Sequence, residues 1–195
     1  MNFFTSDMHL GHRNIVEICS RPFPDVATMI DELIQRNNSM VTDRDDVWDL
    51  GDVAYRCSPW EVAESLKQLN GHRHILLGNH DKPLREAYKK GLLNDMVKTG
   101  KIEIIGGETA IYDKNLIIAK QLTIDGQRVI LSHYSYRTWP SAFRGAIMLY
   151  GHSHGNLSDY YKSFDVGVDS HNFYPWSWLE IKAKMDQIGE GFQEE

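Results

Sequence analysis

The chain contains little cysteine. Cys19 and Cys57 are the only two among 195 residues. Two thiols cannot build the disulfide framework of a small secreted protein, and they exclude a metal site made only of thiolates. The two residues could still form a single disulfide with each other. Such sparse cysteine is typical of proteins from a reducing compartment.

The sequence also lacks any apolar run near the roughly 20 residues that a membrane-spanning helix needs. Its first residues, MNFFTSDMHLGHR, have no basic stretch ahead of the apolar ones and carry Asp7 early, unlike a secretory leader. We therefore expect a soluble, cytoplasmic protein without a membrane partner.

A strong excess of positive charge is missing too. Lys and Arg number 21 against 27 for Asp and Glu, which gives a formal net charge of −6. This balance disfavours broad binding to duplex DNA or to anionic membranes, because both carry negative charge. A local basic patch is still compatible with it.

No internal repeat, low-complexity stretch or long Pro/Gly/Ser linker divides the chain. With 42% hydrophobic and 25% charged residues, its composition is that of one globular domain with a substantial core. We expect a single domain over residues 1–185 and an acidic, frayed C-terminal tail over residues 186–195.

Short β-rich runs alternate with amphipathic segments, which is the pattern of a layered α/β domain. Asp25 to Asn38 has apolar residues at helical spacing, with Asp25 as the N-cap. Ser58 starts a capping box with Pro59 at the first helical position, which predicts a helix to about Leu69.

The region from residue 102 to residue 132 holds five β-rich runs separated by Gly-Gly, Asp-Lys-Asn and Asp-Gly. These separators are turn signals, so we expect an antiparallel meander there. Two further strands are expected over residues 146–150 and 164–168.

Polar clusters follow several of the apolar runs. Ligand sites of α/β sheets lie beyond the carboxyl ends of strands, so these clusters stand where sites form. In chain order they are Asp7-x-His9, Gly51-Asp52, Gly78-Asn79-His80-Asp81, His133 and Gly151-His152-Ser153-His154.

The clusters offer carboxylate, imidazole and amide ligands but no thiolate. Imidazole with carboxylate suits Mn²⁺, Fe, Zn²⁺, Co²⁺ or Ni²⁺ better than Ca²⁺ or Mg²⁺, and the number of ligands indicates two ions. Residues two apart on a strand face the same way. If the chain stays extended, Asp7 with His9 and His152 with His154 can therefore each aim two donors at one point.

Each cluster taken alone has a simpler explanation. Asp7 could cap a helix that starts near Gly11, and Gly51-Asp52 could be an ordinary turn. His133 could be a half-buried, hydrogen-bonded histidine. Five such clusters, each at the end of an apolar run, are better explained together as a metal site.

In this order the clusters resemble the motifs of the calcineurin-like metallophosphoesterase superfamily, which are D-x-H, G-D, G-N-H-[DE], H and G-H-x-H. The motifs run from Asp7 to His154, and the later segment FDVGVDSHNFYP is similar to the closing segment of small single-domain members. The resemblance implies a four-layer α/β/β/α sandwich of two mixed sheets flanked by helices.

The resemblance also implies two divalent metal ions bridged by Asp52, with Mn²⁺ the first expectation and Fe, Zn²⁺, Ni²⁺ and Co²⁺ the alternatives. His80 would be a catalytic residue outside the metal shell, oriented by Asp81. The other ligands would form two sets, Asp7, His9 and His154 for one ion and Asn79, His133 and His152 for the other.

A metal-bridging hydroxide would then attack phosphorus in line, and His80 would protonate the leaving oxygen. The expected substrate is a phosphate ester, with a phosphodiester or a small nucleotide-type molecule preferred. The alternatives are a nuclease on single-stranded ends or short oligonucleotides, and a non-catalytic scaffold with the same fold. The oligomeric state is left open.

Contacts with the rest of the substrate rest on weaker signals. His12 and Arg13 follow the first motif and Arg137 follows the fourth, so we expect them near the substrate. Three aromatic residues could either stack a nucleobase or fill the core beneath a loop: Tyr134, Tyr136 and Trp139.

Overall fold

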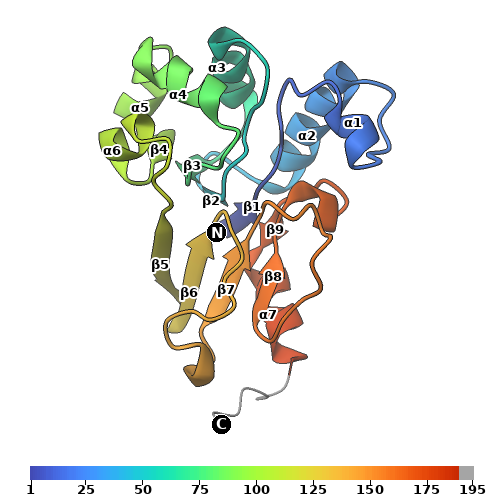
Figure 1. The fold of residues 1–195 in the computed structure, drawn as a ribbon, viewed down its shortest axis with the longest axis vertical. Coiled ribbons are helices and arrows are strands. Elements are labelled where there is room, and N and C mark those ends of the chain that lie inside the picture. The colour runs from blue at the N-terminus through green and yellow to red at the C-terminus, as the bar shows by residue number, and fades with distance from the viewer. Residues whose placement is uncertain (189–195) are drawn as a thin grey trace.

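The computed structural model describes residues 1–188. It contains a five-stranded and a four-stranded sheet, and most of the helices lie beside the five-stranded sheet (Figure 1). The five-stranded sheet has the order β4-β3-β2-β1-β9, and the four-stranded sheet has the order β5-β6-β7-β8. The strands of the first sheet are β1 (Asn2–Thr5), β2 (Asp46–Asp49), β3 (His72–Ile75), β4 (Ile102–Ile104) and β9 (Trp176–Ser177). Those of the second are β5 (Ala119–Ile124), β6 (Gln127–Ser132), β7 (Ile147–Tyr150) and β8 (Ser163–Asp165).

Helices fill the connections between the strands and follow the last of them. Over the described residues the α-helices are α1 (Ile15–Ile18), α2 (Val26–Met40), α3 (Pro59–Gln68), α4 (Lys82–Lys89), α5 (Asn94–Lys98), α6 (Gly107–Tyr112) and α7 (Trp178–Asp186). Two short 3₁₀ helices are η1 (Ala142–Arg144) and η2 (Val168–Ser170).

Both sheets are mixed, as the sequence predicts. β1 to β4 run parallel and β9 is antiparallel to β1. In the second sheet β6, β7 and β8 run parallel and β5 is antiparallel to β6. Helices α2, α3 and α4 bury Met29, Leu66 and Leu84 in the core beside the first sheet, so helices flank the sheets as expected.

The space between the sheets forms a second apolar core. Phe4 and Leu50 come from the first sheet and its loops, and Leu149 and Phe164 come from the second sheet. Trp178 of α7 packs into the same core. Because this core joins the two sheets, it fixes the loops at their ends relative to each other.

The outer face of the second sheet is covered by the segment that follows β6. Trp139 of this segment is only 5% exposed, and its indole N–H donates to the carbonyl of Ala146 at 2.8 Å. Trp139 therefore fills the core and does not stack a base. Tyr136 packs against the same cluster, and its hydroxyl oxygen lies 3.2 Å from that of Ser132.

The two helices predicted in detail are confirmed. The Asp25 side chain accepts a hydrogen bond from the Thr28 N–H at 2.8 Å, and α2 continues to Met40. Ser58 and Glu61 form the reciprocal bonds of a capping box at the start of α3. Local capping chemistry therefore sets both helix starts.

The predicted meander over residues 102–132 is wrong for its first half. β4 pairs parallel with β3 in the first sheet, and the run TAIY lies in α6. Ala110 and Ile111 are buried against the helical core, which favours a helix where the local pattern favours a strand. Only β5 and β6 form the expected antiparallel pair.

Three sequence expectations concern the chain as a whole. Cys19 and Cys57 are both free thiols, so the open question of a disulfide is answered. Over the described residues no helix combines the length and the apolar character that crossing a bilayer requires. The predicted tail over residues 186–195 begins at the last residue of α7, and residues 189–195 lie outside the described part.

Candidate metal centre

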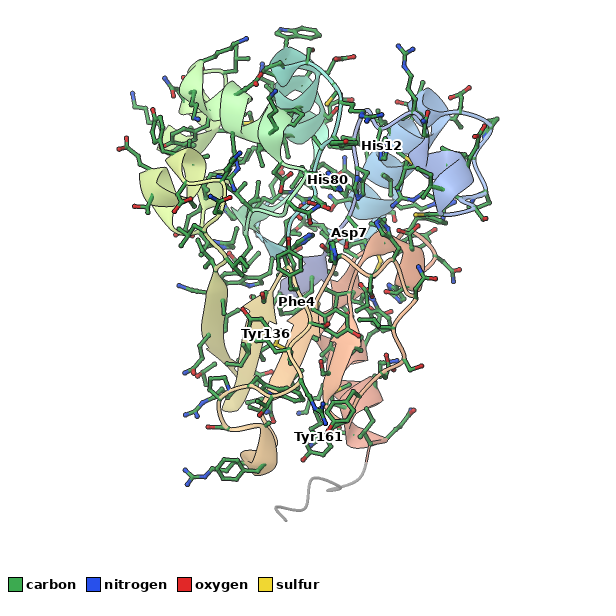
Figure 2. The ribbon with its side chains drawn as sticks, in the orientation of Figure 1. Phe4, Asp7, His12, His80, Tyr136 and Tyr161 are labelled. Carbon is green, nitrogen blue, oxygen red and sulfur yellow. The ribbon has the colours of Figure 1, made fainter. Side chains whose placement is uncertain are left out.

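The polar clusters meet at one end of the two sheets. The D-x-H, G-D and G-N-H-D motifs follow β1, β2 and β3, while His133 and the G-H-S-H motif follow β6 and β7. Figure 2 shows Asp7, His12 and His80 near one another, where the helical half of the molecule meets the second sheet. Loops from both sheets therefore share one site.

Two groups of three side chains each hold their ligand atoms within 4.8 Å of one another. The first group is Asp7, His9 and His154, and the second group is Asp52, His133 and His152. Asp52 lies between them, because its Oδ2 is 3.6 Å from His9 Nε2 and 3.5 Å from His133 Nε2. Asn79 Oδ1 is 3.0 Å from His133 Nε2. All seven residues predicted as ligands therefore converge.

The backbone does not bring them together in the way the sequence suggests. The condition of an extended chain at D-x-H and G-H-S-H is not met, because five of the seven residues have a left-handed backbone. Their φ angles are 59° at Asp7, 52° at His9, 53° at Asp52, 68° at His152 and 50° at His154. Such conformations are costly for residues other than glycine and gather at functional sites.

Two motif glycines make room for these crowded loops. A Cβ on Gly151 would lie 2.0 Å from Ser6 Oγ and 2.5 Å from Asp7 Oδ2. A Cβ on Gly78 would lie 2.2 Å from Asp52 Oδ1 and 2.6 Å from the Asp52 backbone nitrogen. Both positions therefore need a residue without a side chain.

Asp81 supports the loops and is completely buried. Its carboxylate accepts bonds from the backbone N–H groups of Asp52 at 2.9 Å, Gly78 at 2.8 Å and Ala54 at 3.3 Å. The resemblance implies that Asp81 orients His80. The bonds of the Asp81 carboxylate tie the G-D loop to the G-N-H-D turn that carries His80, and they fix Asp52.

Hydrogen bonds also set the orientation of two candidate histidine ligands. His133 Nδ1 is 2.9 Å from the carbonyl oxygen of Leu50, so it donates there and leaves Nε2 for Asp52 and Asn79. His154 Nδ1 is 2.7 Å from Asp169 Oδ2. Partners of this kind fix the tautomer and direction of a metal-binding imidazole.

Asp169 and its partner Arg21 contact the first group, and sequence reasoning missed both. Asp169 lies in the closing segment FDVGVDSHNFYP, whose similarity to family members was the only available signal. No motif includes Arg21, which reaches Asp169 across 148 residues of sequence. A contact of that separation is visible only in the fold.

Unsatisfied polar atoms at the first group fit a cation. Asp7 Oδ1 and both ring nitrogens of His9 are buried without a hydrogen-bond partner among the described residues. Burial raises the pKa of Asp7 to about 7 and lowers the pKa of His9 to about 3. A buried carboxylate beside imidazole nitrogens is the donor set that a divalent transition-metal ion satisfies.

The second group contains a strongly interacting acid–base pair. Burial tends to raise the pKa of Asp52, but its bond with His133 and the charge of that ring lower it to about 2. Burial tends to lower the pKa of His133, and Asp52 raises it. Asp52 is thus held as a carboxylate between the two groups.

His80 and His12 lie at the edge of the first group. The ring centroid of His9 is 5.6 Å from that of His80 and 5.4 Å from that of His12. Tyr55, which the sequence did not single out, contacts both rings at centroid distances of 4.3 Å and 4.7 Å. The backbone N–H of His80 donates to Asp52 Oδ1 at 2.8 Å. His12 is buried, which lowers its pKa.

One hollow lies beside the candidate ligands, and another is lined by residues that follow His133 in the chain. One, of about 310 Å³, is lined by Asn79, His133, Tyr134 and Lys114 together with apolar side chains. The other, of about 490 Å³, is lined by Arg137 and three tyrosines, Tyr136, Tyr150 and Tyr160. Arg137 therefore faces a hollow, whereas the structure gives Arg13 only an exposed position.

Cys19, His154 and Asp169 form a third group within 4.8 Å. Both carboxylate oxygens of Asp169 already accept bonds from the buried guanidinium of Arg21, at 2.8 Å and 2.7 Å. A metal ion there would have to displace that cation. The third group is therefore better described as support for His154 than as an ion site.

Comparison with known proteins agrees with this geometry. The sequence model of the calcineurin-like phosphoesterase family matches residues 3–171. The chain therefore belongs to the calcineurin-like phosphoesterase family. Membership supports a metal-dependent phosphoesterase in general, and the two ligand groups are candidates for its divalent ions.

The similarity to these relatives extends over nearly the whole of each chain. The uncharacterized protein MJ1445 of Methanocaldococcus jannaschii is 29% identical, over 96% of this chain and 92% of that protein. Gene 66 protein of Mycobacterium phage D29 is 25% identical, over 97% and 98%. The crystal structure of AQ665 from Aquifex aeolicus, a protein of unknown function, shares the fold with a TM-score of 0.66 at 21% identity, over 94% and 98%.

Proposed function

We propose that this protein is a dinuclear-metal phosphoesterase that hydrolyses phosphodiesters or small nucleotide-type substrates. One observation carries the proposal. Asp52 stands 3.6 Å from a nitrogen of the first group and 3.5 Å from a nitrogen of the second, as a carboxylate shared by two ions would. Among the metals that suit this donor set we propose Mn²⁺ first, with Fe, Zn²⁺, Ni²⁺ and Co²⁺ as alternatives.

Two divalent cations would lower the pKa of a bound water and take up negative charge on the phosphoryl oxygens. The candidate ligands cancel only half of the positive charge that two such cations bring. Asp7 and Asp52 contribute one negative charge each, while the four candidate histidine ligands and Asn79 are neutral when they bind metal. The site can therefore attract a phosphate although the whole chain carries a charge of −6.

His80 is proposed as the proton donor to the leaving oxygen. It belongs to neither ligand group, and its half-buried ring stands beside those of His9 and Tyr55. Its backbone N–H bond to Asp52 fixes it relative to the site. An imidazolium at that position can give its ring proton to an alkoxide as the ester bond breaks.

The hollows support a substrate with organic substituents. The hollow of about 310 Å³ opens beside Asn79 and His133 and combines Lys114 with apolar side chains. One substituent of a diester could enter it, with Tyr134 at its border. His12, which is buried against Tyr55, is proposed as a phosphate contact, and Arg137 as a contact in the second hollow. Arg13, an exposed residue directly after His12, is proposed as a further substrate contact.

The test is hydrolysis of bis-p-nitrophenyl phosphate beside p-nitrophenyl phosphate by metal-stripped protein reloaded with Mn²⁺, Ni²⁺, Zn²⁺ or Mg²⁺. We expect turnover that depends on metal, is faster on the diester, and is lost in Asp52→Asn. Lys89→Met, which changes a residue of α4 outside both groups, is the control. Turnover independent of Asp52 would contradict the proposal, and no turnover despite two bound ions would favour the scaffold alternative.

A nuclease for single-stranded ends or short oligonucleotides is the second candidate. The segment that begins at His133 lines two hollows, and each holds a basic residue, Lys114 in one and Arg137 in the other. A short strand could contact both. The logarithm of its binding constant would then fall with the logarithm of the salt concentration, with a slope of about −0.7 per phosphate contact, and cleavage at low substrate concentration would fall with it. We expect no comparable binding to duplex DNA, and we propose a cytoplasmic location because both cysteines are free.

A further inference from the structure

The guanidinium of Arg21 joins parts of the molecule that lie far apart in sequence. Its side chain has no exposed surface. Nε and NH2 donate to the two oxygens of Asp169 at 2.8 Å and 2.7 Å. The same group donates to the backbone carbonyls of Asp7 at 2.8 Å and Met8 at 3.1 Å. One buried cation thus holds the first motif against the closing segment.

Asp169 continues this connection to the first group. Its Oδ2 is 2.7 Å from Nδ1 of His154, so the ring donates there and only Nε2 is left for a ligand. The bond also fixes the ring plane. The position of His154 therefore depends on Asp169, and the position of Asp169 depends on the two-pronged bond from Arg21.

The carbonyl bonds of Arg21 act on the other two members of the first group. Asp7 and His9 have a left-handed backbone, with φ angles of 59° and 52°. The carbonyls that accept from Arg21, those of Asp7 and Met8, belong to the stretch of backbone that joins these two residues. Strained backbone persists only where its surroundings hold it. Arg21 supplies part of that hold for the turn that presents Asp7 and His9.

We propose that Arg21 and Asp169 are a positioning pair for the first group and not for the second. The inference rests on the metal centre proposed above. His133 of the second group takes its orientation from the carbonyl of Leu50, and Asp52 takes its position from Asp81. The groups also contact each other, because the backbone N–H of His152 donates to Asp7 Oδ2 at 2.8 Å and that of His9 donates to the Asp52 carbonyl at 2.9 Å. These bonds reach the second group only by way of the first, so loss of the pair should weaken the first ion site far more than the second.

The test is calorimetric titration of the metal-free, full-length chain with Mn²⁺, together with the visible spectrum of the Co²⁺ form. Arg21→Met and Asp169→Asn should lower the affinity of one ion by about 10- to 100-fold and leave the other within threefold. His154→Ala and His152→Ala assign the two binding events, because each removes a candidate ligand from one group. Both pair variants should reproduce the pattern of His154→Ala.

Two further variants separate positioning from general loss of stability. Arg85→Met removes another buried arginine, which donates to the carbonyls of Ala110 and Asp113, and it should leave both affinities unchanged. Arg21→Lys keeps the charge but not the planar fork, so it should resemble Arg21→Met. Pair variants that fold and bind both ions normally would overturn this inference alone. A wild-type chain that binds no ion would overturn the proposed function as well.

Discussion

Five candidate ligands hold a left-handed backbone, and this restricts what can replace them. Asparagine tolerates that conformation better than other residues with a side chain. Asp52→Asn, at φ 53°, therefore removes the charge of the carboxylate with little added backbone strain. The same exchange at Asp7 keeps the backbone and leaves an uncharged group at the buried Oδ1 position. These substitutions test charge at a ligand without distorting its loop.

The role of His80 can be tested by the choice of leaving group. His80→Ala should lower kcat by about 100-fold or more on a diester with an alkoxide leaving group, because that group must be protonated as it departs. The loss on bis-p-nitrophenyl phosphate should be much smaller, since p-nitrophenolate leaves without a proton. Comparing the two kcat ratios measures the effect. Equal losses on both substrates would argue against proton donation.

Gly151→Ala should prevent tight metal binding. The new methyl group would lie 2.0 Å from Ser6 Oγ and 2.5 Å from Asp7 Oδ2, so the G-H-S-H loop or Asp7 has to move. Gly100→Ala is a suitable control, since it adds strain of about 1 kcal/mol at φ 76° with no atom within 4 Å. Metal content after dialysis distinguishes them. Normal metal content in Gly151→Ala would contradict the close approach.

Among the elements, β2 and β3 share a buried ion pair beside the site. Arg73 NH1 donates to Asp49 Oδ2 at 3.0 Å, and NH2 donates to Asn37 of α2 at 2.9 Å. Asp49 also accepts from the Gly51 N–H at 3.3 Å, at the start of the G-D loop. The pair therefore connects the helical layer, the first sheet and the loop that carries Asp52.

Arg73→Leu should lower the free energy of unfolding by about 3–5 kcal/mol, because it leaves the Asp49 carboxylate buried without its partner. The double variant Arg73→Leu with Asp49→Leu should recover much of that loss, since no unpaired charge remains. Urea unfolding of the metal-free chains measures both. A double variant less stable than the single one would show that the pair is itself stabilising.

The sequence was informative where a signal is local. The caps of α2 and α3 need only residues three apart, and the motif clusters needed only their order along the chain. The prediction of a strand failed at TAIY. This run forms part of α6, because Ala110 and Ile111 are buried against residues distant in sequence. The left-handed turns at the ligands and the Arg21–Asp169 pair were also out of reach, because contacts between separate segments create them.

For the whole molecule, the candidate site gives the metal-free fold a distinctive response to pH. Burial raises the pKa of Asp7 from 3.8 to about 7 and lowers that of His9 from 6.5 to about 3. A carboxyl with a raised pKa loses its stabilising contribution as pH rises, while an imidazole with a lowered pKa destabilises the fold as pH falls. Between about pH 4 and 6.5 these two effects oppose each other.

Above that range the raised pKa values of His133 and His154 act in the same direction. Burial tends to lower the pKa of His133, but Asp52 raises it from 6.5 to about 9. Its contribution to stability is full below pH 6.5 and is lost as pH rises to 9. We expect the metal-free chain to unfold at lower urea concentration at pH 9 than at pH 6.5, and His133→Asn to reduce that difference. Equal midpoints in the wild-type chain would contradict the raised pKa.

Each of the two groups takes side chains from loops of both sheets. Asp7 and His9 follow β1 while His154 follows β7, and Asp52 follows β2 while His133 and His152 follow β6 and β7. A cation in either group would thus act as a cross-link across the core between the sheets. The apolar core already joins the sheets without metal, so a bound cation would add a second connection and make their separation rarer. The time for which the folded chain resists proteases would then increase with the concentration of available metal, whether or not any substrate is present.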